Sequence, residues 1–303
     1  MNEKVQHFLE ELFSTTELNR LHEKYGGGRI FSTPIIGVAK GDDPIFEKFK
    51  EVVGPEHFTP VELWRACGQD EESPSNLRIL SIVFPYVDRI REESKDFIEF
   101  PRVKLPADIY SLGRNYANEF KKETCRQSIN FFKNHGYNAV AAMVSEVFSI
   151  YTKGNFYSNW SERHIAYAAA LGTFSLTDAL ITEAGCNVRF TSVVTNAPLQ
   201  ITPRKSDNIH ANCLYYAKGT CRQCEKNCPA NAIDINGHDK NKCWAYGQKI
   251  ERKMRHRIGD ILKPHFRYIN GEWQEQQPPV GCAFCQFDVP CMDKNPMAAE
   301  QKE

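Results

Sequence analysis

The string Cys221-Arg-Gln-Cys224-Glu-Lys-Asn-Cys228-Pro229 decides how the last third of this 303-residue chain is interpreted. A second string follows it, Cys282-Ala-Phe-Cys285-Gln-Phe-Asp-Val-Pro-Cys291. With Cys213 and Cys243, eight of the 11 cysteines fall in this region. Reducing compartments keep thiols free, so clustered cysteines in a cytosolic chain indicate metal ligands rather than disulfides. We therefore expect the function to depend on a metal centre in the C-terminal third.

The spacing of the first string approaches C-x2-C-x2-C-x3-C-P, which wraps iron–sulfur clusters in bacterial ferredoxins. Lys218 stands where that run carries its first cysteine, so Cys213 is the nearest replacement and needs a longer loop. Eight thiolates divide into two four-cysteine clusters. A zinc site is the alternative, but it uses only four ligands. The isolated Cys67, Cys125 and Cys186 are predicted to be small buried apolar residues.

Composition excludes several classes of protein. The 38 basic residues balance 38 acidic ones, which is unlike a dedicated nucleic-acid-binding protein. Hydrophobic residues make up 41%, enough for a sizeable core. No apolar run approaches the roughly 18 residues of a membrane span, and the N-terminus lacks a signal-peptide core. We expect a soluble, cytoplasmic protein with about two domains.

Alternating strand and helix patterns run through residues 25–200 and predict an α/β domain with a central sheet. Strands are expected at 30–38, 77–84, 138–144 and 188–194, and helices at 5–13, 107–134 and 161–171, the last ended by Gly172. Thr59-Pro60-Val61-Glu62 combines a capping box with proline at the first helical position, which predicts a helix start. Beyond Lys205 the sequence changes to short segments separated by cysteines. We therefore place a domain boundary there, giving domains 1–205 and 206–303.

Several motifs together resemble the family of epoxyqueuosine reductases and the related corrinoid-dependent reductive dehalogenases. Beside the two cysteine strings, Cys243-Trp-Ala-Tyr246 is similar to the isolated cysteine of that family, and Ser111-Leu-Gly-Arg114-Asn115-Tyr116 to its Gly-Arg-Asp-Tyr segment. The stretches Ala169-Ala-Leu-Gly172-Thr-Phe and Val188-Arg-Phe-Thr-Ser-Val-Val-Thr195 resemble the region that cradles the corrin. The resemblance covers roughly residues 107–296.

The resemblance implies an α/β cobalamin-binding domain followed by a ferredoxin-like domain with two 4Fe-4S clusters. One cluster is expected on Cys228, Cys243, Cys282 and Cys285. The other is expected on Cys221, Cys224 and Cys291, with Cys213 in place of the displaced ligand. Cobalamin is expected near Gly172, Thr177, Arg189 and Thr195. Only the resemblance points to cobalamin, since Gly172 alone indicates a helix end and Thr195 a strand end.

The proton donor departs from the family pattern. Epoxyqueuosine reductases carry an aspartate shortly before the Ala-rich helix, and here Phe156 falls at about that position. Reductive cleavage needs a general acid, so Tyr157 is the first candidate and Tyr116 the second. A phenol needs a neighbouring cation to lower its pKa for this role. The alternative is that Tyr157 packs in the core and donates one hydrogen bond.

These features predict an oxidoreductase in which two clusters pass electrons to cobalamin for reductive cleavage of a carbon–heteroatom bond, with a small-molecule or modified-nucleoside substrate. The alternative is a non-catalytic electron carrier that has lost the corrinoid, with Phe156 and Trp160 filling the corrin space. The expected partner is a low-potential ferredoxin or flavodoxin. The basic segment 240–267 could bind the phosphates of tRNA or an acidic electron donor. A basic helix face is more often simply exposed to solvent, so tRNA is not the favoured partner.

Overall fold

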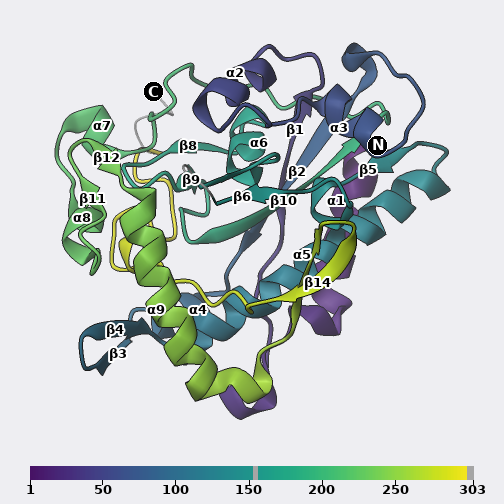
Figure 1. The fold of residues 1–303 in the computed structure, drawn as a ribbon. Helices are drawn as coiled ribbons and strands as arrows, with labels where there is room; N and C mark the ends of the chain where they lie inside the picture. Colours follow the sequence, from purple (N-terminus) through teal and green to yellow (C-terminus); the bar gives the residue numbers. More distant parts are fainter. Residues whose placement is uncertain (153–155, 299–303) are drawn as a thin grey trace.

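An antiparallel sheet with strand order β1-β2-β10-β5 forms the centre of the computed structural model, which describes residues 1–152 and 156–298 (Figure 1). Its strands are β1 (Ile35–Lys40), β2 (Arg78–Pro85), β10 (Val188–Thr195) and β5 (Ala139–Val140). β10 pairs with β2 along its full length, from Val188 opposite Pro85 to Thr195 opposite Arg78. The central sheet expected from the sequence is therefore present, and all its strand pairs are antiparallel.

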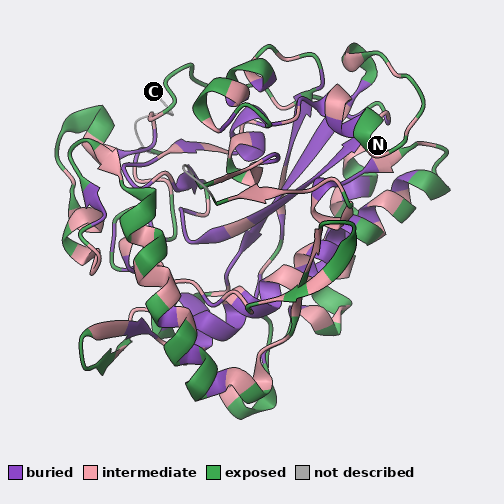
Figure 2. Cartoon of the chain, viewed as in Figure 1, coloured by how far each residue is buried: buried purple, intermediate pink, exposed green. Residues whose placement is uncertain are grey.

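Helices cover both faces of this sheet, which explains why β2 is buried from Ile79 to Pro85 (Figure 2). Leu80 and Ile82 of β2 pack into the core formed with α1 (Asn2–Thr15) and α5 (Asp108–Asn134). Ile79 and Val83 alternate with them and pack into the second core. The helices on that side are α2 (Ile45–Val52), α3 (Pro60–Ala66) and α6 (Glu162–Ala168).

The structure confirms the predicted start of α3, where the Thr59 hydroxyl accepts from the Glu62 amide and the Glu62 carboxylate accepts from the Thr59 amide. The predicted strand 138–144 is confirmed only at Ala139–Val140, because the chain then turns into a 3-10 helix at Ala142–Val144.

Gly172 does not end α6, contrary to the prediction. The helix ends at Ala168, and Ala170 adopts the left-handed conformation with φ of 63°. Gly172 instead begins β8 (Gly172–Phe174), which pairs with β9 (Leu180–Thr182). A Cβ on Gly172 would lie 2.3 Å from the Ile181 carbonyl oxygen, so this hairpin requires the glycine.

The C-terminal third consists of short elements and one long helix, α9 (Lys240–Ile258). The short elements are α7 (Leu214–Lys218), α8 (Gln223–Asn227), β11 (Ile233–Asp234), β12 (Gly237–His238), β13 (His265–Ile269) and β14 (Glu272–Gln276). The remaining helix and strands are α4 (Asp88–Glu93), β3 (Phe97–Phe100), β4 (Val103–Pro106), β6 (Ile150–Tyr151) and β7 (Tyr157–Ser158). Ile250, Met254 and Ile258 of α9 are buried, as their spacing predicts, and they join the same core as α5. The hydrophobic core thus continues past residue 205, and the two-domain division stays a prediction.

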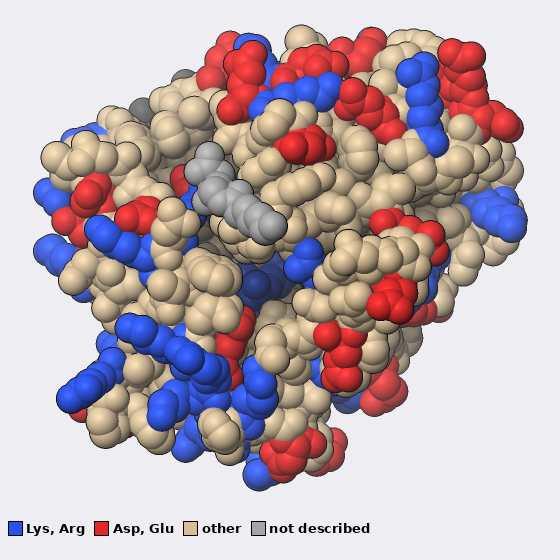
Figure 3. All heavy atoms as spheres, in the orientation of Figure 1, with Lys and Arg blue, Asp and Glu red and all other residues tan. Residues whose placement is uncertain are grey.

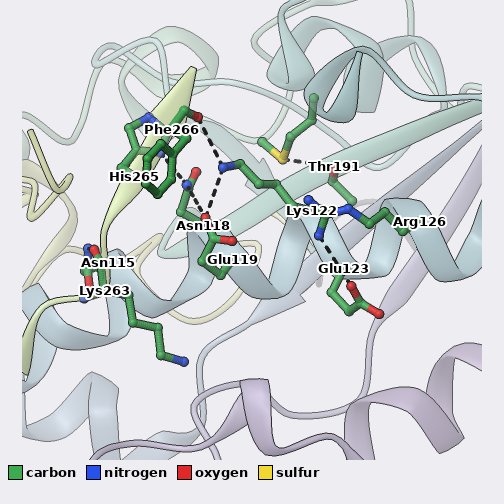
Figure 4. Close-up of polar contacts among 11 residues, drawn as sticks. Asn115, Asn118, Glu119, Lys122, Glu123, Arg126, Thr191, Lys263, His265 and Phe266 are labelled. Carbon is green, nitrogen blue, oxygen red and sulfur yellow. Dashed lines mark hydrogen bonds and ion pairs between the residues drawn. The ribbon is translucent and has the colours of Figure 1, made fainter. Parts of the chain in front are cut away.

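The segment that leads from α9 into β13 lies along α5 (Figure 4). Asn115 exchanges two hydrogen bonds with the backbone of Lys263, at 3.1 and 2.8 Å. One turn further on, the Asn118 side chain lies 2.6 Å from His265 Nδ1, and the Lys122 ammonium donates to the Phe266 carbonyl at 3.2 Å. These polar contacts hold β13 over α5 and form one wall of the large cavity described below. Across the described ranges, no helix has the length and apolar character that crossing a bilayer requires.

Candidate functional site

The first group of cysteines lines a cavity of about 390 Å³ near α7 and α8. Five cysteines line it: the four expected from the sequence, Cys213, Cys221, Cys224 and Cys291, and also Cys285. Burial, together with the charges of the other three expected members, raises the pKa of the Cys224 thiol to about 12. Cys224 therefore lies close enough to the other three sulfurs, including that of Cys213, to interact with them electrostatically.

Cys213 reaches this cavity because of the loop that separates it from Cys221. Cys213 is the N-cap residue of α7, and the helix ends at Gly219. Gly219 adopts the left-handed conformation with φ of 68°, which turns the chain back toward Cys221. The short helix α7 and the glycine that follows it thus allow Cys213 to take the place of a cysteine at position 218.

The second group consists of Cys228, Cys243, Cys282 and Cys285. Burial, together with the charges of Cys243 and Cys228, raises the pKa of Cys282 to about 12. The pKa of Cys285 is raised by burial, by the other three members of the group and by Cys224 of the first group. Cys243 comes from the first turn of α9, so this group joins three separate segments of the chain.

Each group offers four thiols, which is the donor set of a 4Fe-4S cluster. Among residues 1–152 and 156–298, no three Cys, His, Asp or Glu side chains converge closely enough to hold one metal ion. In a 4Fe-4S cluster each thiolate binds a different iron, so the four sulfurs stand farther apart than the ligands of one zinc ion. Burial raises the pKa of Cys224, Cys282 and Cys285, so these thiols must release their protons when they bind a metal. The donor set therefore fits two iron–sulfur clusters.

Cys186 is buried in the hydrophobic core, as the sequence predicts, but another cysteine lies next to it. Its sulfur lies 3.8 Å from that of Cys291, and its amide donates to the Cys291 carbonyl at 2.8 Å. Cys125 agrees with the prediction, because it is fully buried and its sulfur lies 3.0 Å from the Thr191 hydroxyl. Cys67 is half-buried. The first cysteine group therefore has Cys186 as a further cysteine beside it.

A large cavity of about 1350 Å³ opens between α5, α6 and β13, and Figure 3 shows a hollow with basic groups at its bottom. Arg163 of α6 lines it and interacts electrostatically with Cys243 and Cys285. The second cysteine group therefore lies next to this cavity. Trp160, only 1% exposed, and Phe156, 38% exposed, line the cavity rather than fill it.

A neighbouring cavity of about 1360 Å³ shares Arg163, His164 and Lys240 with the first. Phe174 and Asp178 of the β8–β9 hairpin line it. Gly172 and Thr177, two of the positions expected near a corrin, lie in the same hairpin. Thr177 itself lines the cysteine cavity, on the other side. We call the two adjoining cavities the α5 cavity and the hairpin cavity.

The other two positions expected near a corrin lie elsewhere. Arg189 of β10 donates to the hydroxyls of Tyr86 at 3.1 Å and Tyr110 at 2.5 Å. The Thr195 hydroxyl donates to the Asn138 carbonyl at 2.8 Å, at the far end of β10. Gly172, Thr177, Arg189 and Thr195 are therefore not brought together around one cavity, because β10 extends away from the hairpin.

Tyr157 lines the α5 cavity, but its environment is the opposite of the one expected for an acid. Its hydroxyl donates to the Glu56 carboxylate, and this contact raises the pKa of the phenol to about 12. Its ring stacks on Tyr151, with ring centres 4.9 Å apart. No cation lowers the pKa, so Tyr157 holds the segment against the α2–α3 connection.

Tyr116 packs as a core residue of α5. Its hydroxyl donates to the Ile261 carbonyl at 2.9 Å, and burial raises its pKa. The Lys263 ammonium lies 4.2 Å from the centre of its ring. Tyr116 is not among the residues that line the α5 cavity.

Glu162 is the carboxylate that the sequence analysis missed. It begins α6 and lines the α5 cavity. Its Oε2 accepts from the Ser192 hydroxyl at 2.7 Å, and the Ser192 oxygen accepts from the Trp160 indole at 2.9 Å. Burial raises the pKa of Glu162 to about 7, and the nearby Lys121 ammonium opposes that rise. A carboxyl at the start of an Ala-rich helix was the available signal, but its pattern equally indicates an ordinary first-turn acid.

No family model matches the chain, and neither does any curated protein. Among solved structures, an epoxyqueuosine reductase is similar with a TM-score of 0.50 and 14% identity, over 98% of this chain and 70% of that one. A second structure, an epoxyqueuosine reductase with a modified tRNA stem loop, has a TM-score of 0.47 and 14% identity, over 98% and 70%. A catabolic reductive dehalogenase has a TM-score of 0.47 and 15% identity, over 88% of this chain and 31% of that one. The chain therefore has the fold of epoxyqueuosine reductase.

Proposed function

We propose that this chain is a reductase that carries two 4Fe-4S clusters and delivers their electrons to a corrinoid in the adjoining cavities. The observation that supports it most is the grouping of eight cysteines into two sets of four, one of which lies beside a large cavity. Electrons would leave from the second group past Arg163. Because Arg163 lines the adjoining cavities, the acceptor would lie there.

The adjoining cavities have the position that a corrinoid needs. They meet at Arg163, His164 and Lys240, beside the second cysteine group. Arg163 and Lys240 would donate hydrogen bonds to the amide rim or the phosphate of the cofactor. When bound, the corrinoid would supply a low-potential cobalt for cleavage of a carbon–heteroatom bond. The open cavity argues against the electron-carrier alternative, which requires Phe156 and Trp160 to fill this space.

Glu162 takes the role of proton donor in this proposal, in place of the two tyrosines. A carboxyl with a pKa of about 7 is protonated in about half of the molecules at neutral pH, which suits a general acid. Ser192 and Trp160 hold the carboxylate toward the cavity. The proton would pass from Glu162 to the fragment that leaves the substrate.

Metal analysis of the full chain, reconstituted anaerobically with iron, sulfide and cobalamin, tests this proposal. We expect about eight irons and one cobalt per chain, with an EPR signal of the cobalamin lacking its lower axial base. A protein that binds iron but never cobalamin is the electron carrier and refutes the corrinoid. A protein that takes up zinc and no iron refutes the clusters.

The substrate is tested separately. Complementation of a strain that lacks epoxyqueuosine reduction, scored by queuosine in its tRNA, asks whether this chain acts on epoxyqueuosine. A negative result with a folded, cofactor-loaded protein excludes epoxyqueuosine and leaves the reductase proposal intact.

The exposed basic face of α9 is the surface we propose for an acidic ferredoxin or flavodoxin. Figure 3 shows basic groups gathered over this helix. Its exposed members are Lys249, Arg252, Lys253, Arg255 and Arg257. Cys243, a ligand in the second group, lies in the first turn of the same helix. Complementary charge would speed the encounter with an acidic donor.

A further inference from the structure

The α5 cavity has a strongly positive lining. Along α5, Arg114, Asn118, Lys121 and Lys122 recur on one face and point into it. Arg163, Lys240 and Arg267 add three more cations from α6, α9 and β13. Glu162 is the one acidic residue among the described residues that line the cavity. Six cations therefore face one carboxyl group.

Some of these cations already have partners. The Lys122 ammonium donates to Glu119 at 3.0 Å and to the Phe266 carbonyl at 3.2 Å (Figure 4). Arg163 donates to the Asp178 carbonyl at 2.5 Å. These two side chains need no ligand to satisfy them.

The cations at the α5 end of the cavity differ from Lys122 and Arg163 because they have no such partners among the described residues. Neither Arg114 nor Lys121 makes a hydrogen bond or ion pair within residues 1–152 and 156–298, and the buried Nε of Arg267 has no partner there either. Arg114 feels the charge of Glu251, which lies too far away for an ion pair. Burial, together with the like charges of Arg114 and Arg189, lowers the pKa of Lys121 to about 8. Unpaired cations held together in this way are costly, and an anion between them removes the cost.

We infer that the α5 end of the cavity binds a small anionic molecule through its carboxylate or phosphate group, held by Arg114 and Lys121. Lys121 and Glu162 interact electrostatically, so the bound anion lies next to the proposed proton donor. This inference rests on the proposed function and makes the substrate an anion. A cavity walled by α5, α6 and β13 favours a small molecule, whereas the exposed basic surface of the protein lies on α9.

Isothermal titration of the cluster-loaded protein without corrinoid tests the inference. The probes are inorganic phosphate, benzoate and the uncharged benzamide, which matches benzoate in shape. We expect one site per chain for phosphate or benzoate, and the tighter of the two identifies the anionic group. Benzamide should bind at least tenfold more weakly than benzoate.

Arg114→Gln and Lys121→Gln should each weaken anion binding at least tenfold, because each removes one charge from the site. Arg126→Gln is the matched control, since Arg126 lies on the same helix but is exposed and paired with Glu123 at 3.4 Å. It should bind within twofold of the parent. Thermal melting checks that each variant folds, and Lys121→Met replaces any variant that does not.

Absence of anion binding, equal binding of benzamide, or an equal loss in Arg126→Gln overturns the inference. A short single-stranded RNA that displaces phosphate and loses affinity in the Lys121 variant also overturns it, by assigning the site to nucleic acid. The titration needs neither cobalt nor turnover. A failed corrinoid reconstitution therefore leaves its result unaffected, and a failed titration leaves the clusters intact.

Discussion

The two cysteine groups have different surroundings. The first group lies among apolar side chains such as Leu176, Ile181 and Val289, with Cys186 beside Cys291. The second group has cations next to it, because Arg163 interacts with Cys243 and Cys285, and Lys104 with Cys282. Nearby positive charge stabilises the reduced, more negative form of a cluster and raises its potential. If the proposed clusters are bound, this difference would favour electrons on the second group, next to the cavity.

Removing one ligand from each group is the strongest test of this comparison. Cys221→Ala and Cys285→Ala should each lose one of two clusters, so the iron content should fall by about half and reductase activity should vanish. Cys213→Ala should behave like Cys221→Ala, whereas Cys186→Ala should keep its full iron content. Iron analysis and EPR of the reduced proteins provide the measurement. Full iron content in Cys213→Ala would remove that residue from the first group.

Glu162→Gln should lower turnover by about 10²- to 10⁴-fold, because it removes the proton donor on the side where electrons leave. Cluster content should be unchanged. The parent needs protonated Glu162, so its rate should be full below the pKa of about 7 and fall as the pH rises above it. A pH–rate profile of both proteins gives the measurement. An unaltered profile in the variant would assign the proton to another group.

Reversing charges on α9 should have a moderate effect. Lys249→Glu with Arg252→Glu should slow reduction of the clusters by an acidic ferredoxin roughly tenfold at low salt, with little effect near 1 M salt because of screening. Reduction by dithionite should not change. Stopped-flow absorbance at several salt concentrations measures the rates. A loss of equal size with dithionite would point to damaged clusters rather than to a docking surface.

The smallest effect concerns Cys186. Its sulfur lies close enough to Cys291 to donate a hydrogen bond, and such bonds raise cluster potentials. Cys186→Ala should lower the potential of the first cluster, whereas Cys186→Ser should keep most of it, since a hydroxyl can also donate. Redox titration followed by EPR compares the three proteins. A shift confined to the second cluster would contradict the assignment of Cys291 to the first.

Local patterns predicted much of the fold. The capping box at Thr59 and Glu62 and the helix over 107–134 follow from contacts within one or two turns, and both are confirmed. The predicted role of Gly172 as a helix end is wrong. The residue lacks a side chain because the Ile181 carbonyl of the paired strand lies too close for a Cβ atom. That partner lies in another strand, so helical periodicity could not reveal it.

The sequence alone determined the eight cysteines and their spacing, because ligand spacing within a loop is a local property. The resemblance to a known family supplied their division into two sets. Only the tertiary structure decided that Cys186 lies beside Cys291, that Arg189 and Thr195 lie away from the cavities, and that Glu162 faces Lys121. These relations depend on how β10, α5 and α6 pack across the sheet. Burial and the charges of distant segments then set the pKa of Glu162, and neither is encoded in its neighbours along the chain.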